Sequence, residues 1–259
     1  MMTVSAERIA RYLKASSLFS VEVHPVLQST NDTVKALARD GAPAGTVVFA
    51  EQQTGGRGRM GRSFFSPPGS GIYMTLLLRP QNALQGATAV TTFAAVAVAR
   101  AIEQVADCSP AIKWVNDIFL GGKKVCGILA EGAIAPDGRG FDFIALGIGI
   151  NVKETAFPAE LSHIATSLET ECGGAIDRDR LSAALLDELA PLLLGEIPQM
   201  AMDEYRRRNL VLGRALTVVV GDRSFPATAV RIEDDGNLIV KTEDGREERL
   251  FAGEVSLRI

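Results

Sequence analysis

The sequence predicts a mixed α/β (α+β) protein, followed by a small β-barrel of the SH3-like kind. Over the first 210 residues, segments rich in β-branched residues alternate with segments whose apolar residues recur at helical spacing. After about Leu212 the helical spacing stops, and short alternating segments are separated by Gly-Asp and Asp-Gly turns. About five short strands in so few residues are typical of a small barrel. We therefore expect two domains, at residues 1–210 and 211–259.

Capping residues and apolar spacing locate the helices. Ser29, Thr30, Asn31 and Asp32 are residue types that begin a helix, and the apolar residues after them keep helical spacing until Gly41. An Ala-rich segment further on is typical of a buried helix. The predicted helices are 5–15, the segment between Ser29 and Gly41, 84–105, 178–194 and 198–207.

β-Branched and aromatic residues between turn signals locate the strands. A loop rich in Gly, Arg, Ser and Pro at 54–71 separates two of them. The expected strands of the larger domain are 20–27, 46–50, 72–78, 111–114, 118–120, 125–133 and 141–150, and those of the barrel include 216–220, 227–232, 238–240 and 250–251.

Composition argues against several classes of function. Lys and Arg total 27 against 31 for Asp and Glu, and the net charge of −4 disfavours a general nucleic-acid-coating protein. With two histidines, no CxxC pair and no HExxH segment, neither a structural zinc site nor a zincin-type hydrolase is expected. The three scattered cysteines suit a reducing cytosol. Residues 1–14 lack the apolar core of a signal peptide, and 80–99 is too weakly hydrophobic for a membrane span, so we expect a cytoplasmic protein.

The segment 55–62 concentrates positive charge among glycines. It places Arg57, Arg59 and Arg62 so that guanidinium groups and backbone N–H groups can converge on one anion, such as a triphosphate or an activated phosphate ester. An Arg/Gly-rich segment can equally contact nucleic acid or nothing in particular, but this one lies between two predicted strands rather than in a tail. It is not a Walker loop, because GxxxxGK[ST] does not occur in the chain.

Three further segments place polar residues or glycines in or beside predicted strands. Residues 113–117 and 123–131 each join lysine to a strand. Taken singly, Trp114 fits core packing, and Lys123 with Lys124 fits a solvated hairpin turn. In 147–151, glycines alternate within a strand, which weakens the strand unless a flat ligand or a tightly packed helix approaches its backbone.

Together these motifs resemble the biotin–protein ligase family, and they occur in one order along the chain. The resemblance covers nearly the whole sequence, including residues 253–258 within the small barrel. It implies a mixed-sheet catalytic domain of the class II synthetase-like, biotin/lipoate ligase kind, with a C-terminal SH3-like barrel. The motifs are Ser29-Thr30-Asn31, Gln53 ahead of the Gly/Arg loop, Lys113-Trp114-Val115-Asn116-Asp117, Lys124 with Gly127-Ile128-Leu129, and Gly147 to Asn151.

The resemblance also implies roles for individual residues, with Arg57 and Lys124 as the catalytic pair. Val115 stands where the family usually has Pro, and Phe64 or Phe65 stands at the aromatic, usually Trp, that is expected to stack on adenine. The implied nucleotide-binding residues are Arg59, Arg62, Phe64, Lys113, Asn116 and Asp117. The implied biotin-binding residues are Ser29, Thr30, Asn31, Gln53, Gly56, Arg57, Gly58, Arg59, Lys124, Gly127 and Gly147.

The family's activity is ATP-dependent biotinylation in two steps. Biotin and ATP, with Mg²⁺, form biotinyl-5′-AMP, and a lysine amine of a biotin carboxyl carrier protein then attacks it. No covalent enzyme intermediate and no bound prosthetic group are implied. Because a carboxylate is ionised at neutral pH, the first step needs charge neutralisation and in-line positioning rather than a general base. A chain nearly free of His and Cys can therefore perform it.

The expected partners are biotin, ATP and the carrier protein, with no membrane partner. Only about 20 residues precede the catalytic pattern, too few for the winged helix-turn-helix of roughly 60 residues that the family's repressors carry, so we expect a monofunctional ligase that binds no DNA. Relatives are monomers or sheet-edge dimers, so a homodimer is compatible with the resemblance.

Two alternatives stay open. A lipoate or octanoate ligase of the same superfamily also acylates a carrier lysine, but the intact Arg loop and Lys113-Trp114 disfavour it. A nucleic-acid-binding module could use the Arg loop and the barrel, but the acidic charge balance disfavours that function.

Overall fold

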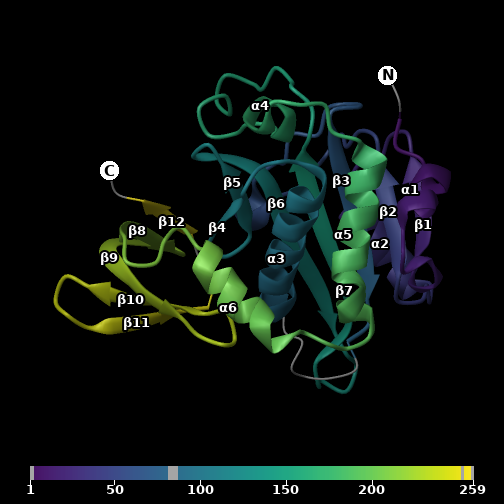
Figure 1. Ribbon diagram of the computed structural model, residues 1–259. Helices are drawn as coiled ribbons and strands as arrows, with labels where there is room; N and C mark the ends of the chain where they lie inside the picture. The colour runs from purple at the N-terminus through teal and green to yellow at the C-terminus, as the bar shows by residue number, and fades with distance from the viewer. Residues whose placement is uncertain (1–2, 81–86, 252–253, 258–259) are drawn as a thin grey trace.

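Figure 1 shows the computed structural model, which describes residues 3–80, 87–251 and 254–257. The larger sheet has seven strands in the order β1-β2-β3-β7-β6-β5-β4. β1 and β2 run parallel, and every other neighbouring pair runs antiparallel, so the sheet is mixed as predicted. The strands are β1 Ser20–His24, β2 Thr46–Ala50, β3 Gly71–Leu78, β4 Ala111–Lys113, β5 Asp117–Leu120, β6 Lys123–Ile134 and β7 Phe141–Asn151.

Helices cover both faces of this sheet, because the central strands are apolar on both sides. In β2, Val48 packs with Val34 of α2, whereas Val47 and Phe49 belong to the core under α3. This alternation places α2 on one face and α3, α5 and α1 on the other, as Figure 1 shows. The helices are α1 Ala6–Tyr12, α2 Thr30–Arg39, α3 Ala87–Val105, α5 Arg178–Leu193 and α6 Gln199–Arg208.

The predicted elements are confirmed with small shifts at their ends. The strand predicted at 20–27 ends at His24, because Leu27 makes only an isolated bridge with Gln53. Residues 84–86 of one predicted helix lie outside the described residues, as do 253 and 258 of the C-terminal motif. Sequence spacing missed α4 Leu168–Cys172, whose five residues are too few to show a helical period; the Ser167 hydroxyl caps it by accepting from the Thr170 N–H.

The smaller sheet has five antiparallel strands in the order β11-β10-β9-β8-β12. No pairing joins its edge strands β11 and β12 within the described ranges, so closure into an SH3-like barrel stays a prediction, as do the domain limits at 210 and 211. The strands are β8 Ala215–Val220, β9 Arg223–Ile232, β10 Leu238–Thr242, β11 Glu247–Leu250 and β12 Glu254–Leu257.

The smaller sheet is tied to the segment that follows β4. The buried indole N–H of Trp114 donates to the Gly236 carbonyl at 2.9 Å, and the Tyr205 hydroxyl donates to the Val115 carbonyl at 2.9 Å. The peptide bond between Trp114 and Val115 is cis. Trp114 is thus both a core residue and a link between the sheets, and the link holds the backbone that leads to Asn116.

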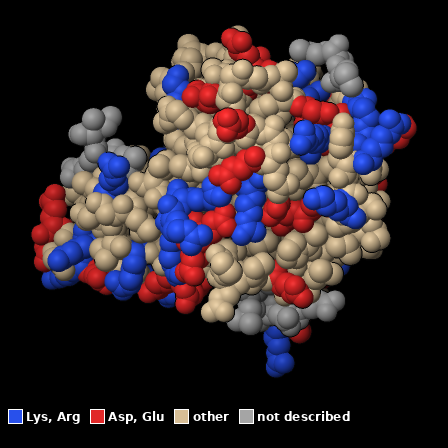
Figure 2. Space-filling view, viewed as in Figure 1, with Lys and Arg blue, Asp and Glu red and all other residues tan. Residues whose placement is uncertain are grey.

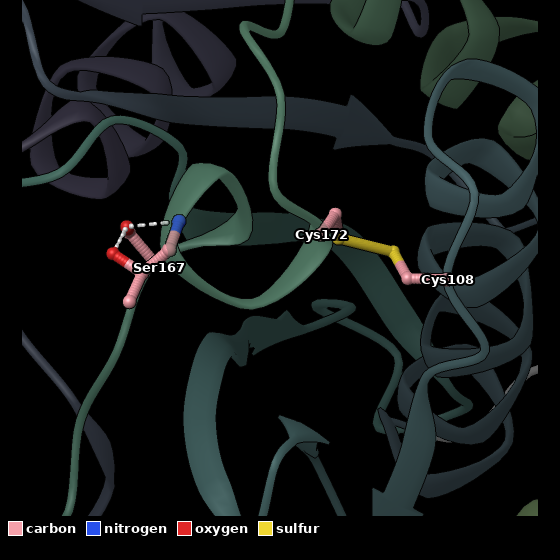
Figure 3. Close-up of a disulfide and its surroundings, with 4 residues drawn as sticks. Cys108, Ser167 and Cys172 are labelled. Carbon is pink, nitrogen blue, oxygen red and sulfur yellow. Dashed lines mark hydrogen bonds between the residues drawn. A yellow bond between two sulfur atoms is a disulfide. The ribbon is translucent and has the colours of Figure 1, made fainter.

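Cys108 and Cys172 are joined by a disulfide, with their Cα atoms 5.6 Å apart. This corrects the expectation of three reduced thiols. The bond joins the chain just after α3 to the last residue of α4 across 64 residues of sequence, and Figure 3 shows that it fastens α4 against the core. Sequence spacing could not reveal the pair, because α4 itself gave no signal. Cys126 is free and buried, and burial raises its pKa well above the ordinary thiol value.

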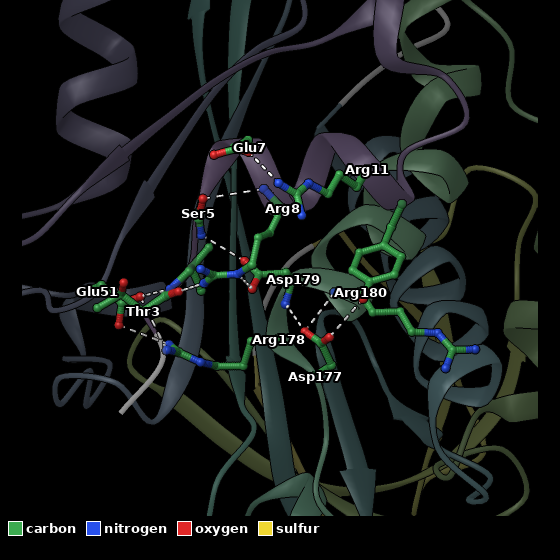
Figure 4. Close-up of polar contacts among 12 residues, drawn as sticks. Thr3, Ser5, Glu7, Arg8, Arg11, Glu51, Asp177, Arg178, Asp179 and Arg180 are labelled. Carbon is green, nitrogen blue, oxygen red and sulfur yellow. Dashed lines mark hydrogen bonds and ion pairs between the residues drawn. The ribbon is translucent and has the colours of Figure 1, made fainter.

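The segment before α1 is fastened to the sheet and to α5 by a cluster of charged side chains (Figure 4). The Arg178 guanidinium lies 3.2 Å from a Glu51 carboxylate oxygen and also donates to the Gly71 carbonyl at 2.9 Å. Asp179 accepts hydrogen bonds from the Ser5 N–H and from the Arg8 guanidinium. The cluster fixes Glu51, which lies two residues before Gln53.

The face over α3, α5 and α6 carries charges of both signs. Arg100 pairs with Glu204 at 2.6 Å, and Arg208 pairs with Glu103 at 2.6 Å. Figure 2 shows Lys and Arg side chains intermingled with Asp and Glu on this face, rather than the basic stripe that a nucleic-acid surface requires. Within the described part of the chain, no helix is long and apolar enough to cross a bilayer.

Candidate functional site

A cavity of about 450 Å³ opens on the α2 face of the larger sheet. Its volume is in the range of sites that hold a small molecule. It brings together every site residue predicted from the sequence except Gly56, which lies just behind the wall and accepts a hydrogen bond from the Phe64 N–H. The predicted residues that line it are Ser29, Thr30, Asn31, Gln53, Arg57, Gly58, Arg59, Arg62, Phe64, Lys113, Asn116, Asp117, Lys124, Gly127 and Gly147.

One end of the cavity is built from uncharged polar side chains at the start of α2. The Ser29 hydroxyl caps the helix by accepting from the Asp32 N–H, which leaves Thr30 and Asn31 in its first turn, buried against β3 and β7. Gln53 accepts hydrogen bonds from the Thr30 N–H at 2.9 Å and from its hydroxyl at 3.1 Å. A neutral, hydrogen-bonding ring fits this end.

The glycines of β7 are required by close contact with neighbouring side chains. A Cβ on Gly147 would lie 2.1 Å from Asn31 Oδ1, and a Cβ on Gly149 would lie 2.6 Å from the Phe64 ring. Glycine at these two positions therefore leaves room for Asn31 and Phe64 to pack directly against the strand backbone. At Gly147 the close approach comes from Asn31 of α2, which is the helix-packing alternative, and a flat ligand against this strand stays a prediction.

The other end of the cavity is cationic, because the Gly/Arg loop folds over it. The loop closes on itself through the Gly58 N–H, which donates to the Arg62 carbonyl at 2.7 Å. Arg57 forms an ion pair with Asp32 of α2, and Arg59 donates to the Asn116 side-chain carbonyl at 3.1 Å. Burial acts to raise the pKa of Asp32, but Lys35 and the Arg57 guanidinium outweigh it and hold that pKa below its ordinary value.

Lys124 and Asp117 meet where β5 and β6 pair. The Lys124 ammonium lies 2.7 Å from an Asp117 carboxylate oxygen. Lys113 projects over the Phe119 ring, 5.6 Å from its centroid. The motifs at 113–117 and 123–131 are thus neighbours in space, because the hairpin of β5 and β6 brings Asp117 beside Lys124.

Phe64 lies against the sheet, with its ring edge-on to Tyr73 at 6.4 Å between centroids. Its predicted stacking on adenine stays a prediction. Sequence reasoning missed a wall formed by Phe157, Leu161, His163, Ile164 and Ala165, as well as Val255 and Ser256 of β12. The wall continues the sheet through Lys124, whose N–H donates to the Ile164 carbonyl. Residues 157–165 form no motif, so the sequence held no signal for them, whereas Val255 and Ser256 belong to the C-terminal motif, to which no site role was given.

The cavity thus combines a neutral polar end with a cluster of cations, which suits a ligand that has a polar ring and an anionic group. Within the described ranges, no group of three His, Cys, Asp or Glu side chains could by itself hold a metal ion. The oxygen atoms of Asn116 and Asp117 are the metal-compatible donors beside the cations.

Two family models match the chain. Residues 23–151 match the biotin/lipoate A/B protein ligase family, and residues 211–258 match the biotin protein ligase C-terminal domain. The bifunctional ligase/repressor BirA of Bacillus subtilis is 36% identical over 240 residues, which cover 90% of this chain and 73% of that protein. The biotin–[acetyl-CoA-carboxylase] ligase of Mycobacterium tuberculosis is 34% identical, with 88% of this chain and 85% of that protein covered.

The fold gives the same result. The biotin protein ligase from Aquifex aeolicus, solved in complex with biotin and ATP, superposes with a TM-score of 0.78 at 27% identity, covering 92% of this chain and 98% of that one. The α/β domain and its cavity define the biotin/lipoate ligase class of protein. With its C-terminal domain and these relatives, the chain belongs to the biotin protein ligase family of enzymes.

Proposed function

We propose that this chain joins biotin to ATP as biotinyl-5′-AMP and then transfers biotin to a lysine of a biotin carboxyl carrier protein. The observation that carries the proposal is that one cavity contains both a neutral polar end and the cations of the Gly/Arg loop. The relatives named above as biotin ligases support it, as does the biotin and ATP complex of the Aquifex aeolicus protein.

In the first step a biotin carboxylate oxygen bonds to the α-phosphorus of ATP, and the bond from that phosphorus to the bridging oxygen breaks, which releases pyrophosphate. The carboxylate is already ionised at neutral pH, so no residue has to remove a proton. Two negatively charged groups must instead approach each other, and the cations Arg57, Arg59 and Lys124 offset their repulsion. The loop arginines exchange Asp32 and Asn116 for ligand oxygens, and Lys124 shares its charge between Asp117 and the ligand.

In the second step an uncharged lysine amine of the carrier bonds to the biotinyl carbonyl carbon, AMP leaves with the electron pair of the broken C–O bond, and the amine nitrogen releases one proton to water as the amide forms. Positioning dominates this step too, because the mixed anhydride is already a good acyl donor. Mg²⁺ would enter on the ATP phosphates, with Asp117 and Asn116 as the protein oxygens that fit it, and would neutralise phosphate charge.

The proposal is tested by exchange of labelled pyrophosphate into ATP. We expect exchange that depends on biotin and that lipoate or octanoate does not support, because the polar end of the cavity matches a ring with N–H groups. Exchange driven by lipoate and not by biotin would replace this function with the superfamily alternative. Absence of exchange with all three acids would overturn both.

Replacing Gly147 with alanine should weaken biotin binding by about tenfold or more, because the new methyl group meets the buried Asn31 side chain and overpacking of this kind is strongly unfavourable. Isothermal titration of the protein with biotin measures the change. Gly174→Ala is the matched control, since nothing lies within 4 Å of its added Cβ. Equal dissociation constants for both variants would mean that Asn31 is not part of the biotin site.

A further inference from the structure

Behind the polar end of the cavity, the side chains of Asn31, Thr75, Thr30 and Gln53 lie within hydrogen-bond distance of one another in that order. The Thr75 hydroxyl of β3, fully buried, lies 2.6 Å from Asn31 Oδ1 and 2.8 Å from the Thr30 hydroxyl. The Thr30 hydroxyl in turn lies 3.1 Å from Gln53 Oε1. Each hydroxyl has one proton, so the directions of these bonds depend on one another.

The Gln53 end of this series has a fixed orientation. Its side-chain carbonyl accepts the Thr30 backbone N–H, which can only donate. Its amide nitrogen donates to the Ser66 hydroxyl at 3.1 Å, and the Ser66 proton goes to the Phe64 carbonyl. Gln53 Oε1 is therefore an acceptor toward Thr30.

The Asn31 end is fixed by Glu131 of β6. Asn31 Nδ2 lies 2.8 Å from Glu131 Oε2 and 3.4 Å from the Leu129 carbonyl, both of which only accept. The amide nitrogen must face them, so Oδ1 faces Thr75. Burial acts to raise the pKa of Glu131, but the hydrogen bond from Asn31 and the Lys35 ammonium at 3.0 Å outweigh it, and the pKa lies below its ordinary value. The carboxylate is therefore ionised at neutral pH.

These two fixed ends determine the protons between them. Thr75 must donate its only proton to Asn31 Oδ1, because that oxygen has none. The Thr30 hydroxyl donates its proton to Gln53 Oε1, inside the protein, so the contact between Thr75 and Thr30 carries no proton. What Thr30 offers to the cavity is its oxygen lone pairs, so this end of the site presents acceptors and suits a ligand ring that donates N–H groups.

We propose that Glu131 is a positioning residue for the ring of biotin, acting through the cavity-lining amide of Asn31 and, through it, setting the hydrogen-bond direction of Thr75. Glu131 does not line the cavity, whereas Asn31 does. The inference rests on the proposed function, because it explains how the site prefers the N–H groups of a cyclic urea. The sequence motifs include Asn31 and Thr30 but not Thr75, and they give Glu131 no role.

Glu131→Gln tests this with almost no change in shape. The Lys35 ammonium, which lies 3.0 Å from Glu131 Oε1 and also pairs with Asp32 at 3.2 Å, cannot accept from an NH₂ group, so the new amide turns its carbonyl to Lys35 and its NH₂ to Asn31. Two NH₂ groups cannot face each other, so the Asn31 amide, which lines the cavity, turns over and donates to Thr75. Thr75 then donates to Thr30, which takes up one Thr30 lone pair inside the protein, while the Thr30 hydroxyl donates to Gln53 as before. We expect the dissociation constant for biotin, measured calorimetrically on the full chain, to rise about tenfold. The KM for ATP should stay within about twofold, because the cations are unchanged.

A second substitution separates positioning from simple loss of a contact. Lys35→Met alone leaves the Glu131 carboxylate facing Asn31, so biotin binding should stay within about threefold of the unmodified chain. In Glu131→Gln with Lys35→Met, no ammonium claims the new carbonyl, which can turn to Asn31 and restore the original direction. The double variant should therefore bind biotin more tightly than Glu131→Gln, approaching Lys35→Met.

The outcomes are distinct. Recovery in the double variant supports the positioning role, since a merely structural contribution of the ion pair would make the double variant weaker than either single one. A double variant as weak as Glu131→Gln, or a Glu131→Gln variant with unchanged biotin affinity, overturns the inference while leaving the proposed function intact. Failure of the unmodified chain to bind biotin overturns the proposed function itself.

Discussion

Replacing Lys124 with alanine should slow biotinyl-adenylate formation by about tenfold to a hundredfold, with the fold retained. Its ammonium lies 2.7 Å from Asp117 in the cavity wall, so the variant loses a cation beside the reacting anions and leaves a carboxylate that repels them. A charge-assisted contact of this kind contributes about 1.5–3 kcal/mol, which accounts for the size of the effect. Single-turnover assays that follow biotinyl-AMP with saturating biotin and ATP measure it directly.

The neighbouring lysine provides the control. Lys123 donates to the Ser162 carbonyl on the exposed side of the same strand, so Lys123→Ala should form the adenylate at a rate close to that of the unmodified chain. Circular dichroism melting curves for both variants establish that neither is unfolded. If the two alanine variants form adenylate equally fast, Lys124 has no part in the first step.

Replacing Arg178 with methionine should lower the free energy of unfolding by about 3–5 kcal/mol, because it leaves the buried Glu51 carboxylate without its partner. The Gly71 carbonyl loses its donor as well. Urea denaturation followed by circular dichroism measures the change. This would be the largest stability effect expected among the variants considered, since Arg178 is the most deeply buried cation of the Figure 4 cluster.

Arg180→Met, on the exposed side of the same helix, is the matched control and should change the unfolding free energy by less than about 0.5 kcal/mol. Replacing Glu51 with leucine together with Arg178→Met should recover part of the loss, because no isolated charge then remains buried. An Arg178→Met variant as stable as the Arg180→Met control would show that the ion pair does not hold α5 to the sheet.

The sequence predicted those local features that depend on contiguous residues. Ser29 to Asn31 cap and begin a helix, and the loop arginines alternate with glycines, so their chemistry is visible without a structure. The cavity adds only the fact that these segments meet. Strand β2 at Thr46–Ala50 was predicted to the residue, because an apolar, β-branched segment between turns has few other structures open to it.

What the sequence could not show are contacts made across the sheet. Thr75 is an ordinary strand residue by pattern, and its role appears only when β3 brings it beneath the first turn of α2. Glu131 lies near the end of β6, where a charged residue usually faces solvent. The Cys108–Cys172 bond and the wall at 157–165 depend in the same way on segments without periodicity, for which neither spacing nor propensity carries information.

The most direct test of the proposed activity is the intact mass of a biotin acceptor domain after incubation with this chain, biotin and Mg-ATP. We expect the acceptor to gain one biotinyl group on a single lysine, with no gain when ATP or biotin is omitted and a much slower gain with Lys124→Ala. An acceptor that stays unmodified with the unaltered chain, under conditions in which a known biotin ligase modifies it fully, would contradict the assignment of this cavity to biotin transfer.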